Sequence, residues 1–152
     1  LHITFFADNI YFFCPSFFNT FICRRFQYYY YFEVTRSIDF QLGIGMPQKA
    51  ARLRYLRDRW VHAVREVKGV NILTPEDATL TGAITGFRMH QRGTGDANRA
   101  LAATLHDEFG IFTFQRTGLA NGDCVRVTPT LYNTPADADK LAAALRTIAA
   151  RG

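Results

Sequence analysis

The stretch from Asp123 to Thr134, with the sequence DCVRVTPTLYNT, constrains the fold of this chain more than any other feature. Its first half alternates along residues 124–128, so that Val125 and Val127 share one side of a predicted strand. Arg126 falls on the opposite side, together with Cys124. A strand with one apolar and one polar side predicts a sheet that is covered by the core on a single face.

The second half of this stretch predicts the start of a helix. Thr134 is a favoured N-cap residue, Pro135 suits the first helical position, and Asp137 supplies an acid at the third position. A strand that leads into a helix within a few residues indicates a domain in which helices and strands pack together.

The rest of the chain supplies further elements with similar signals. Helices are expected over residues 47–68, 96–109 and from 135 onward, with Asp96 as the cap of the second, and strands over residues 70–73, 83–89, 111–115 and 124–128. The order is helix, two strands, helix, two strands, helix. This order predicts an α/β fold of the small α+β type, with a small, mostly antiparallel sheet and helices on one face.

Residues 1–36 differ in composition from residues 37–152. Fourteen of the first 32 residues are Phe or Tyr, only eight aromatic residues follow, and all eleven glycines lie at Gly43 or later. We therefore expect two segments, with residues 1–36 outside the native fold. The alternative is a degenerate membrane anchor, which polar residues and Pro15 disfavour.

The predicted helix over residues 47–68 carries seven basic residues and two acids, and this excess equals the net charge of +5 of the whole chain. Leu53, Leu56, Trp60 and Val64 recur at helical spacing and give it one apolar side. A basic helix is compatible with a non-enzymatic interaction or nucleic-acid-binding module. We favour a solvated face opposite an apolar stripe, because no nucleic-acid-binding motif accompanies the charges.

No motif for metal binding or nucleophilic catalysis is recognisable. The four histidines and three cysteines lack ligand spacing, and there is no phosphate-binding glycine loop and no nucleophile elbow. Cys124 is expected to be a small, inert sheet residue. We predict no catalytic residue and no metal site in this chain, and a reducing, cytoplasmic location.

Arg126 is the one candidate for a binding role. A guanidinium on a short strand, followed by a Pro-containing bend, is suited to holding a carboxylate through two hydrogen bonds. The alternative is an ordinary strand arginine that is paired with a neighbouring acid.

The motifs GIFTFQRTG and CVRVTPTLYNT and the acid-containing last helix resemble the C-terminal small domain of class V aminotransferases. FQLGIG, ARLRYLRDRW and GVNILTP resemble the preceding part of the same domain, so the resemblance covers residues 38–152. These enzymes use pyridoxal phosphate and have the aspartate-aminotransferase fold type. Within the class, the chain is most similar to the isopenicillin-N-epimerase-like branch.

The resemblance implies that Arg126 binds the α-carboxylate of an amino-acid substrate, and that Tyr132 and Asn133 are structural. It also implies a homodimeric parent enzyme, with no nucleic-acid or membrane partner. It leaves open whether the reaction is a transamination or an epimerisation, and whether the parent enzyme is exported. The loop before the arginine strand has no cysteine, which argues against desulfurase chemistry.

The resemblance supplies no cofactor lysine. Lys49, Lys68 and Lys140 all fall in predicted helices of the small domain. We therefore expect this chain alone to be inactive and not to bind pyridoxal phosphate, because the protein's contribution to such chemistry lies in binding and orienting the cofactor.

Overall fold

The computed structural model describes the backbone of residues 19–90 and 92–151 and the side chains from residue 32 onward within those ranges. The chain divides into two units, Leu1–Ile44 and Gly45–Gly152. None of the helices in the described ranges is both long and apolar enough to cross a membrane.

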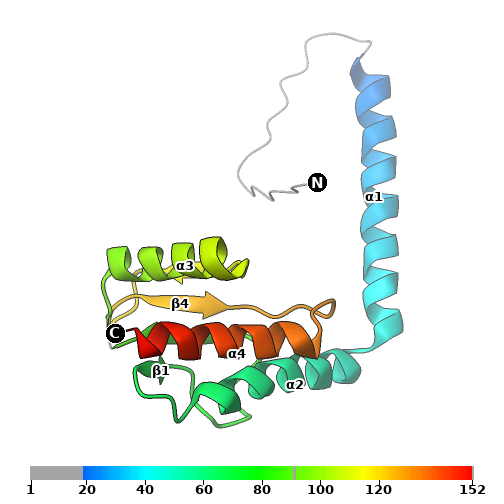
Figure 1. The fold of residues 1–152 in the computed structure, drawn as a ribbon. Helices are drawn as coiled ribbons and strands as arrows, with labels where there is room; N and C mark the ends of the chain where they lie inside the picture. Colours follow the sequence, from blue (N-terminus) through cyan, green and yellow to red (C-terminus); the bar gives the residue numbers. More distant parts are fainter. Residues whose placement is uncertain (1–18, 91, 152) are drawn as a thin grey trace. The chain divides into compact units, whose positions relative to one another are not determined.

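The described part of the first unit is one helix, α1 (Asn19–Ile44) (Figure 1). It runs through position 36, where the composition changes, so the structure places no break in secondary structure there. Its apolar side chains from residue 32 onward are largely exposed, including Phe32, Phe40 and Leu42. That residues 1–36 lie outside the native fold stays a prediction, and residues 1–18 lie outside the described residues.

The second unit has the predicted order of elements. They are α2 (Met46–Val64), β1 (Val70–Ile72), β2 (Thr85–Met89), α3 (Gly95–Phe109), β3 (Phe114–Arg116), β4 (Cys124–Val127) and α4 (Pro135–Ala150). The strands form one sheet in the order β1-β2-β4-β3, and every neighbouring pair is antiparallel. The predicted α/β fold with a small antiparallel sheet is confirmed.

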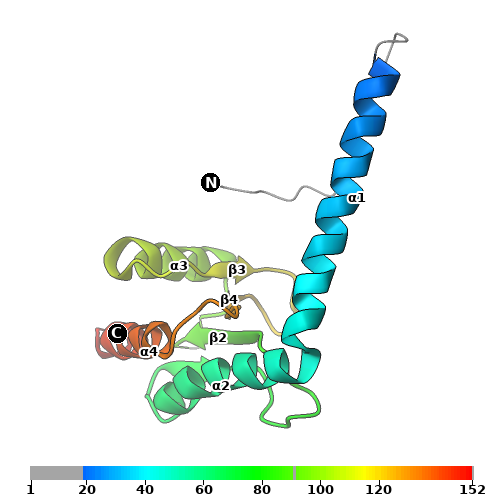
Figure 2. The same ribbon diagram turned by 90° about the vertical axis from the view of Figure 1, so that its right-hand side faces the viewer.

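Helices α2, α3 and α4 lie on one side of this sheet (Figure 2). Phe87 of β2 and Val125 of β4 pair in register, and both are fully buried beneath the helices. Because side chains alternate along a strand, the residues between them reach the other side of the sheet. We call that other side the open face.

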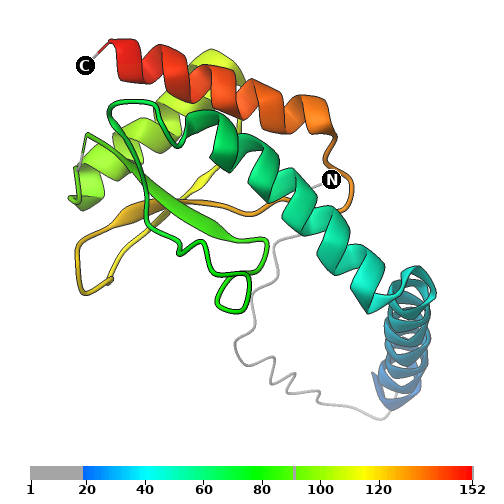
Figure 3. The same ribbon diagram turned by 90° about the horizontal axis from the view of Figure 1, so that it is seen from below.

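Trp60 is the centre of the core. This side chain of α2 is 1% exposed and meets the ring of Phe87 edge-on, with ring centroids 5.9 Å apart. Helix α4 lies beside α2 (Figure 3) and contributes Leu141 and Leu145 to the same buried cluster. The apolar stripe predicted from Leu53 to Val64 thus faces the sheet and α4 through Trp60 and Val64, and Leu56 on the same stripe is also buried.

The start of α4 matches its sequence signals. The Thr134 hydroxyl accepts a hydrogen bond from the Asp137 amide, and the Asp137 carboxylate accepts one from the Thr134 amide at 2.8 Å. This reciprocal pair is a capping box that satisfies two otherwise free backbone donors. The cap predicted for α3 is wrong by two residues: Thr94, not Asp96, accepts the hydrogen bond from the Ala97 amide.

Three other boundaries differ from the prediction by two residues or more. The third strand was expected over residues 111–115 but spans Phe114–Arg116. Ile111 stays outside the strand because its amide donates a hydrogen bond to the Leu105 carbonyl at the end of α3 and its side chain packs on the core. Helix α2 ends at Val64, before Gly69 (φ 96°), with the intervening residues in tight turns. Strand β2 begins at Thr85, after a loop that extends through Ile84.

The capping box makes stability sensitive to acid. Hydrogen bonds from the Thr134 amide and from Asn133 hold the pKa of Asp137 below its ordinary value of 3.8. A lowered folded-state pKa contributes stability above the unfolded-state pKa, and this contribution is lost as the pH falls through the folded-state value. Below about pH 4 the unmodified chain should lose unfolding free energy, and we expect the Asp137→Asn variant to lose less of it. Urea unfolding of both proteins at several pH values measures the difference. An unchanged pH dependence would contradict this assignment.

Candidate substrate-binding site

The open face of the sheet carries one row of residues across three strands. Arg126 of β4 pairs in register with Gly86 of β2 on one side and with Phe114 of β3 on the other. A Cβ atom added to Gly86 would lie 3.3 Å from the sulfur of Cys124, so the space over Gly86 is narrow and that sulfur occupies part of it. Phe114 is 55% exposed.

Arg126 itself is half-buried, and its side chain has no partner among the described residues. Its Nε atom is buried and has no hydrogen bond, and the guanidinium forms no ion pair with any carboxylate of the described residues. The alternative of a strand arginine paired with an acid therefore does not hold in this part of the chain. A buried donor without a partner is costly, and such groups are common where a ligand completes the hydrogen bonding.

Two further arginines share the open face with Arg126. Arg88 lies on β2, two residues after Gly86, and Arg116 lies on β3, two residues after Phe114. Since Gly86 and Phe114 pair directly with Arg126, both arginines are its diagonal neighbours. Cys124 is 4% exposed, and burial raises the pKa of its thiol despite the opposing effect of these arginines. A buried thiol with a raised pKa is a poor nucleophile, as expected for a structural cysteine.

Arg88 fixes the loop that leads into β4. Its Nε atom donates to the Asp123 carbonyl at 2.5 Å, and its Nη2 atom donates to the Gly122 carbonyl. The Asp123 carboxylate accepts a hydrogen bond from the Gly118 amide at 3.1 Å, and the Asp123 amide donates to the Gly93 carbonyl at 2.7 Å. This role of Arg88 was not predicted, because its partners are backbone carbonyls distant in sequence.

The corner after β4 is held by Asn133. Its side-chain oxygen accepts hydrogen bonds from the amide and hydroxyl of Thr130, at 2.8 and 3.1 Å, and Arg52 of α2 donates to its carbonyl at 3.0 Å. Tyr132 is 79% exposed. Asn133 therefore ties the corner to α2, whereas Tyr132 makes no comparable contact with other residues that the structure describes.

Most of the arginines of α2 are engaged within the domain. Arg59 holds both carboxylate oxygens of Asp139, at 2.6 and 2.8 Å, which raises the pKa of Arg59 and lowers that of Asp139. Arg65 pairs with Glu76 in the loop after β1. Arg52 binds the corner described above. These contacts leave fewer cations available for a nucleic acid, so the geometry does not favour the basic interaction module.

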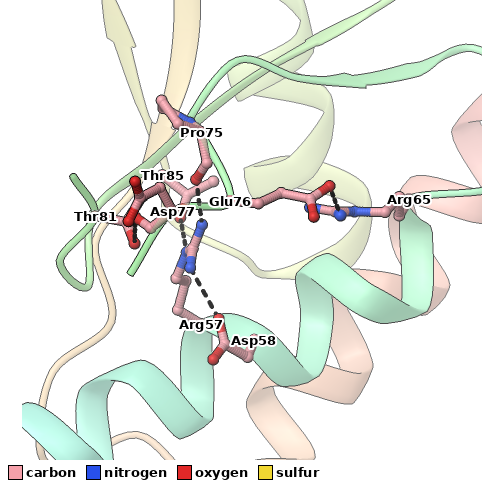
Figure 4. Close-up of polar contacts among 8 residues, drawn as sticks. All are labelled: Arg57, Asp58, Arg65, Pro75, Glu76, Asp77, Thr81 and Thr85. Atoms are coloured by element: carbon pink, nitrogen blue, oxygen red, sulfur yellow. Dashed lines mark hydrogen bonds and ion pairs between the residues drawn. The ribbon is translucent and has the colours of Figure 1, made fainter. Parts of the chain in front are cut away.

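Arg57 of α2 is buried in a polar network (Figure 4). Its Nε atom donates to the Thr85 hydroxyl at 3.3 Å, and its Nη2 atom donates to the Pro75 carbonyl at 3.2 Å. Its Nη1 atom lies 2.9 Å from the Asp58 carboxylate. The guanidinium thus joins α2 to β2 and to the loop between β1 and β2.

We expect Arg57→Met to lower the unfolding free energy by about 2 kcal/mol, because it removes one buried and one partly buried hydrogen bond and leaves their acceptors unsatisfied. Chemical denaturation measures this change. Arg54→Met is the matched control, since Arg54 lies on the same helix with an exposed side chain, and its effect should stay within about 0.5 kcal/mol. Equal effects of the two substitutions would contradict the role of Arg57.

The described residues do not form a pyridoxal-phosphate site. The three lysines of the chain lie in α2, just after it, and in α4, on elements that border the opposite side of the sheet from Arg126. The nitrogen of Lys140 approaches Gly110 at the end of α3, so it points away from the open face. Residues 19–90 and 92–151 also contain no group of three potential metal ligands.

Comparison with known proteins finds a relative that matches most of the chain. The chain is 33% identical over 113 residues to a protein named isopenicillin N epimerase from Amycolatopsis lactamdurans. The match covers 74% of this chain and 27% of the relative, so the matched part is about a quarter of the relative's length. No protein-family model matches the chain.

Proposed function

We propose that residues 37–152 correspond to the C-terminal small domain of a pyridoxal-phosphate-dependent enzyme of the class V aminotransferase family, on the branch that includes isopenicillin N epimerase. The 33% identity over 113 residues supports this relationship. The antiparallel sheet covered by helices on one face is consistent with such a domain.

In this proposal Arg126 binds the α-carboxylate of an amino-acid substrate. The observation that carries it is the unsatisfied Nε atom of a half-buried arginine on an otherwise open sheet face. A guanidinium presents its donors in a planar fork that matches a carboxylate, and partial burial strengthens such a contact.

The remaining parts of the active site would come from a separate cofactor-bearing region. When bound there, pyridoxal phosphate supplies the electron sink for chemistry at the substrate α-carbon. The described residues of this chain contribute substrate orientation only. The parent enzyme is proposed to be a homodimer in the cytoplasm, and its reaction to be an epimerisation or a transamination.

The nucleotide sequence around codon 37 tests this proposal. We expect the DNA upstream of this codon, read in all three frames, to encode a cofactor-binding region with a Schiff-base lysine. An upstream region that encodes no such segment in any frame would contradict the assignment of residues 37–152 to this family.

A further inference from the structure

The open face holds more positive charge than one carboxylate requires. Arg88, Arg116 and Arg126 are neighbours on it, and none of the three forms an ion pair with a carboxylate of the described residues. Like charges grouped on one surface repel each other, which costs stability unless an anion binds among them. The nearest acid in sequence, Asp123, is bound to the Gly118 amide.

The three arginines differ in what they can offer a ligand. The Nε and Nη2 atoms of Arg88 bind backbone carbonyls, and this residue is only 9% exposed. Arg116 is exposed at the end of β3, and its side chain has no hydrogen-bonded partner in the described part of the chain. Arg116 and Arg126 are thus the two available guanidinium groups.

The strand positions of Arg116 and Arg126 suit one ligand with two anionic ends. Arg126 pairs with Phe114, and Arg116 lies two residues farther along the same strand. Diagonal neighbours of this kind have Cα atoms about 7–8 Å apart, within reach of long side chains. The spacing fits two carboxylates separated by a short aliphatic chain, with the exposed ring of Phe114 alongside.

We infer that the substrate carries a second carboxylate, which Arg116 binds while Arg126 binds the first. This inference rests on the proposed function, because it extends the carboxylate site of Arg126. It names the substrate class as acidic amino acids or peptides with an acidic side chain. Arg116 is therefore a specificity-determining residue, and Arg88 holds the adjacent loop.

Binding of simple carboxylates to the full 152-residue chain tests the inference. Glutarate and butyrate, which differ by one carboxylate, are titrated at constant ionic strength, and the dissociation constants are measured by NMR of the arginine Nε–H groups. We expect glutarate to bind about tenfold more tightly than butyrate, as one additional charge-assisted contact would produce. Arg116→Gln should bring the two affinities within about twofold of each other, because the second contact is lost.

The controls separate the inference from the proposed function. Arg54→Gln removes an equal charge from α2 and should leave the preference for glutarate intact. If butyrate binds through Arg126 but Arg116 gives no preference for glutarate, the inference about the second carboxylate is wrong. The proposed function is not contradicted by that result. Tighter binding of inorganic phosphate than of glutarate would also overturn the inference. Equal affinities in the Arg126→Gln variant and the unmodified chain would contradict the proposed function itself.

Discussion

Replacing Arg126 by glutamine is expected to lower kcat/KM about a hundredfold in an enzyme that uses this domain, which corresponds to about 2.7 kcal/mol of lost transition-state stabilisation. The enzyme for this test is a chimera in which residues 37–152 replace the matching segment of isopenicillin N epimerase from Amycolatopsis lactamdurans. The size of the effect follows from the loss of the hydrogen bonds that Arg126 is proposed to donate to the substrate carboxylate. Arg126 is the single charged residue of β4, so no other side chain of this strand can replace it. Steady-state kinetics with isopenicillin N measure it.

The matched control is Arg99→Gln in the same chimera. Arg99 lies on α3, where it pairs with Asp96 and is exposed, so its loss should leave kcat/KM within about twofold. Arg126→Lys retains the charge but not the planar fork, and should recover only part of the activity. If Arg126→Gln retained full activity in a folded, cofactor-loaded chimera, Arg126 would have no role in substrate binding.

The second large effect is expected at Trp60. Replacement by alanine should lower the unfolding free energy by about 3–5 kcal/mol, because it removes a large buried side chain and leaves a cavity between α2 and the sheet. A loss of this size is a large part of the stability of a domain this small. Urea denaturation followed by circular dichroism measures it, since Trp60 is the only tryptophan of the chain and fluorescence would be lost.

Leu80→Ala provides the comparison for Trp60. Leu80 is 71% exposed in the loop between β1 and β2, so its truncation should change the unfolding free energy by less than about 0.5 kcal/mol. A loss below about 1 kcal/mol for Trp60→Ala would mean that the core is not organised around this side chain.

The features predicted correctly from the sequence are those that depend on local chemistry. Thr134 and Asp137 are close in sequence and bond to each other, so the start of α4 could be predicted from spacing alone. The buried stripe of α2 followed from the 3.6-residue period, because Leu56, Trp60 and Val64 occupy one side of any helix. Such signals do not depend on the rest of the fold.

The incorrect predictions concern positions where distant contacts decide the structure. Ile111 has a strand-forming sequence around it, but closing α3 and packing on the core keep it out of the sheet. The alternation from Cys124 to Thr128 identified the side on which Arg126 lies. It could not reveal that Arg88 and Arg116 lie on the same face, because that depends on the order and register of three strands.

In the proposed function, residues 37–152 form the substrate-orienting domain of a pyridoxal-phosphate enzyme, with Arg126 as its carboxylate ligand. The most direct test is the epimerase activity of the chimera described above, measured with and without Arg126→Gln. We predict an active chimera whose activity is lost with Arg126. A chimera that folds and holds its cofactor but shows no activity, or the same activity without Arg126, would contradict the claim.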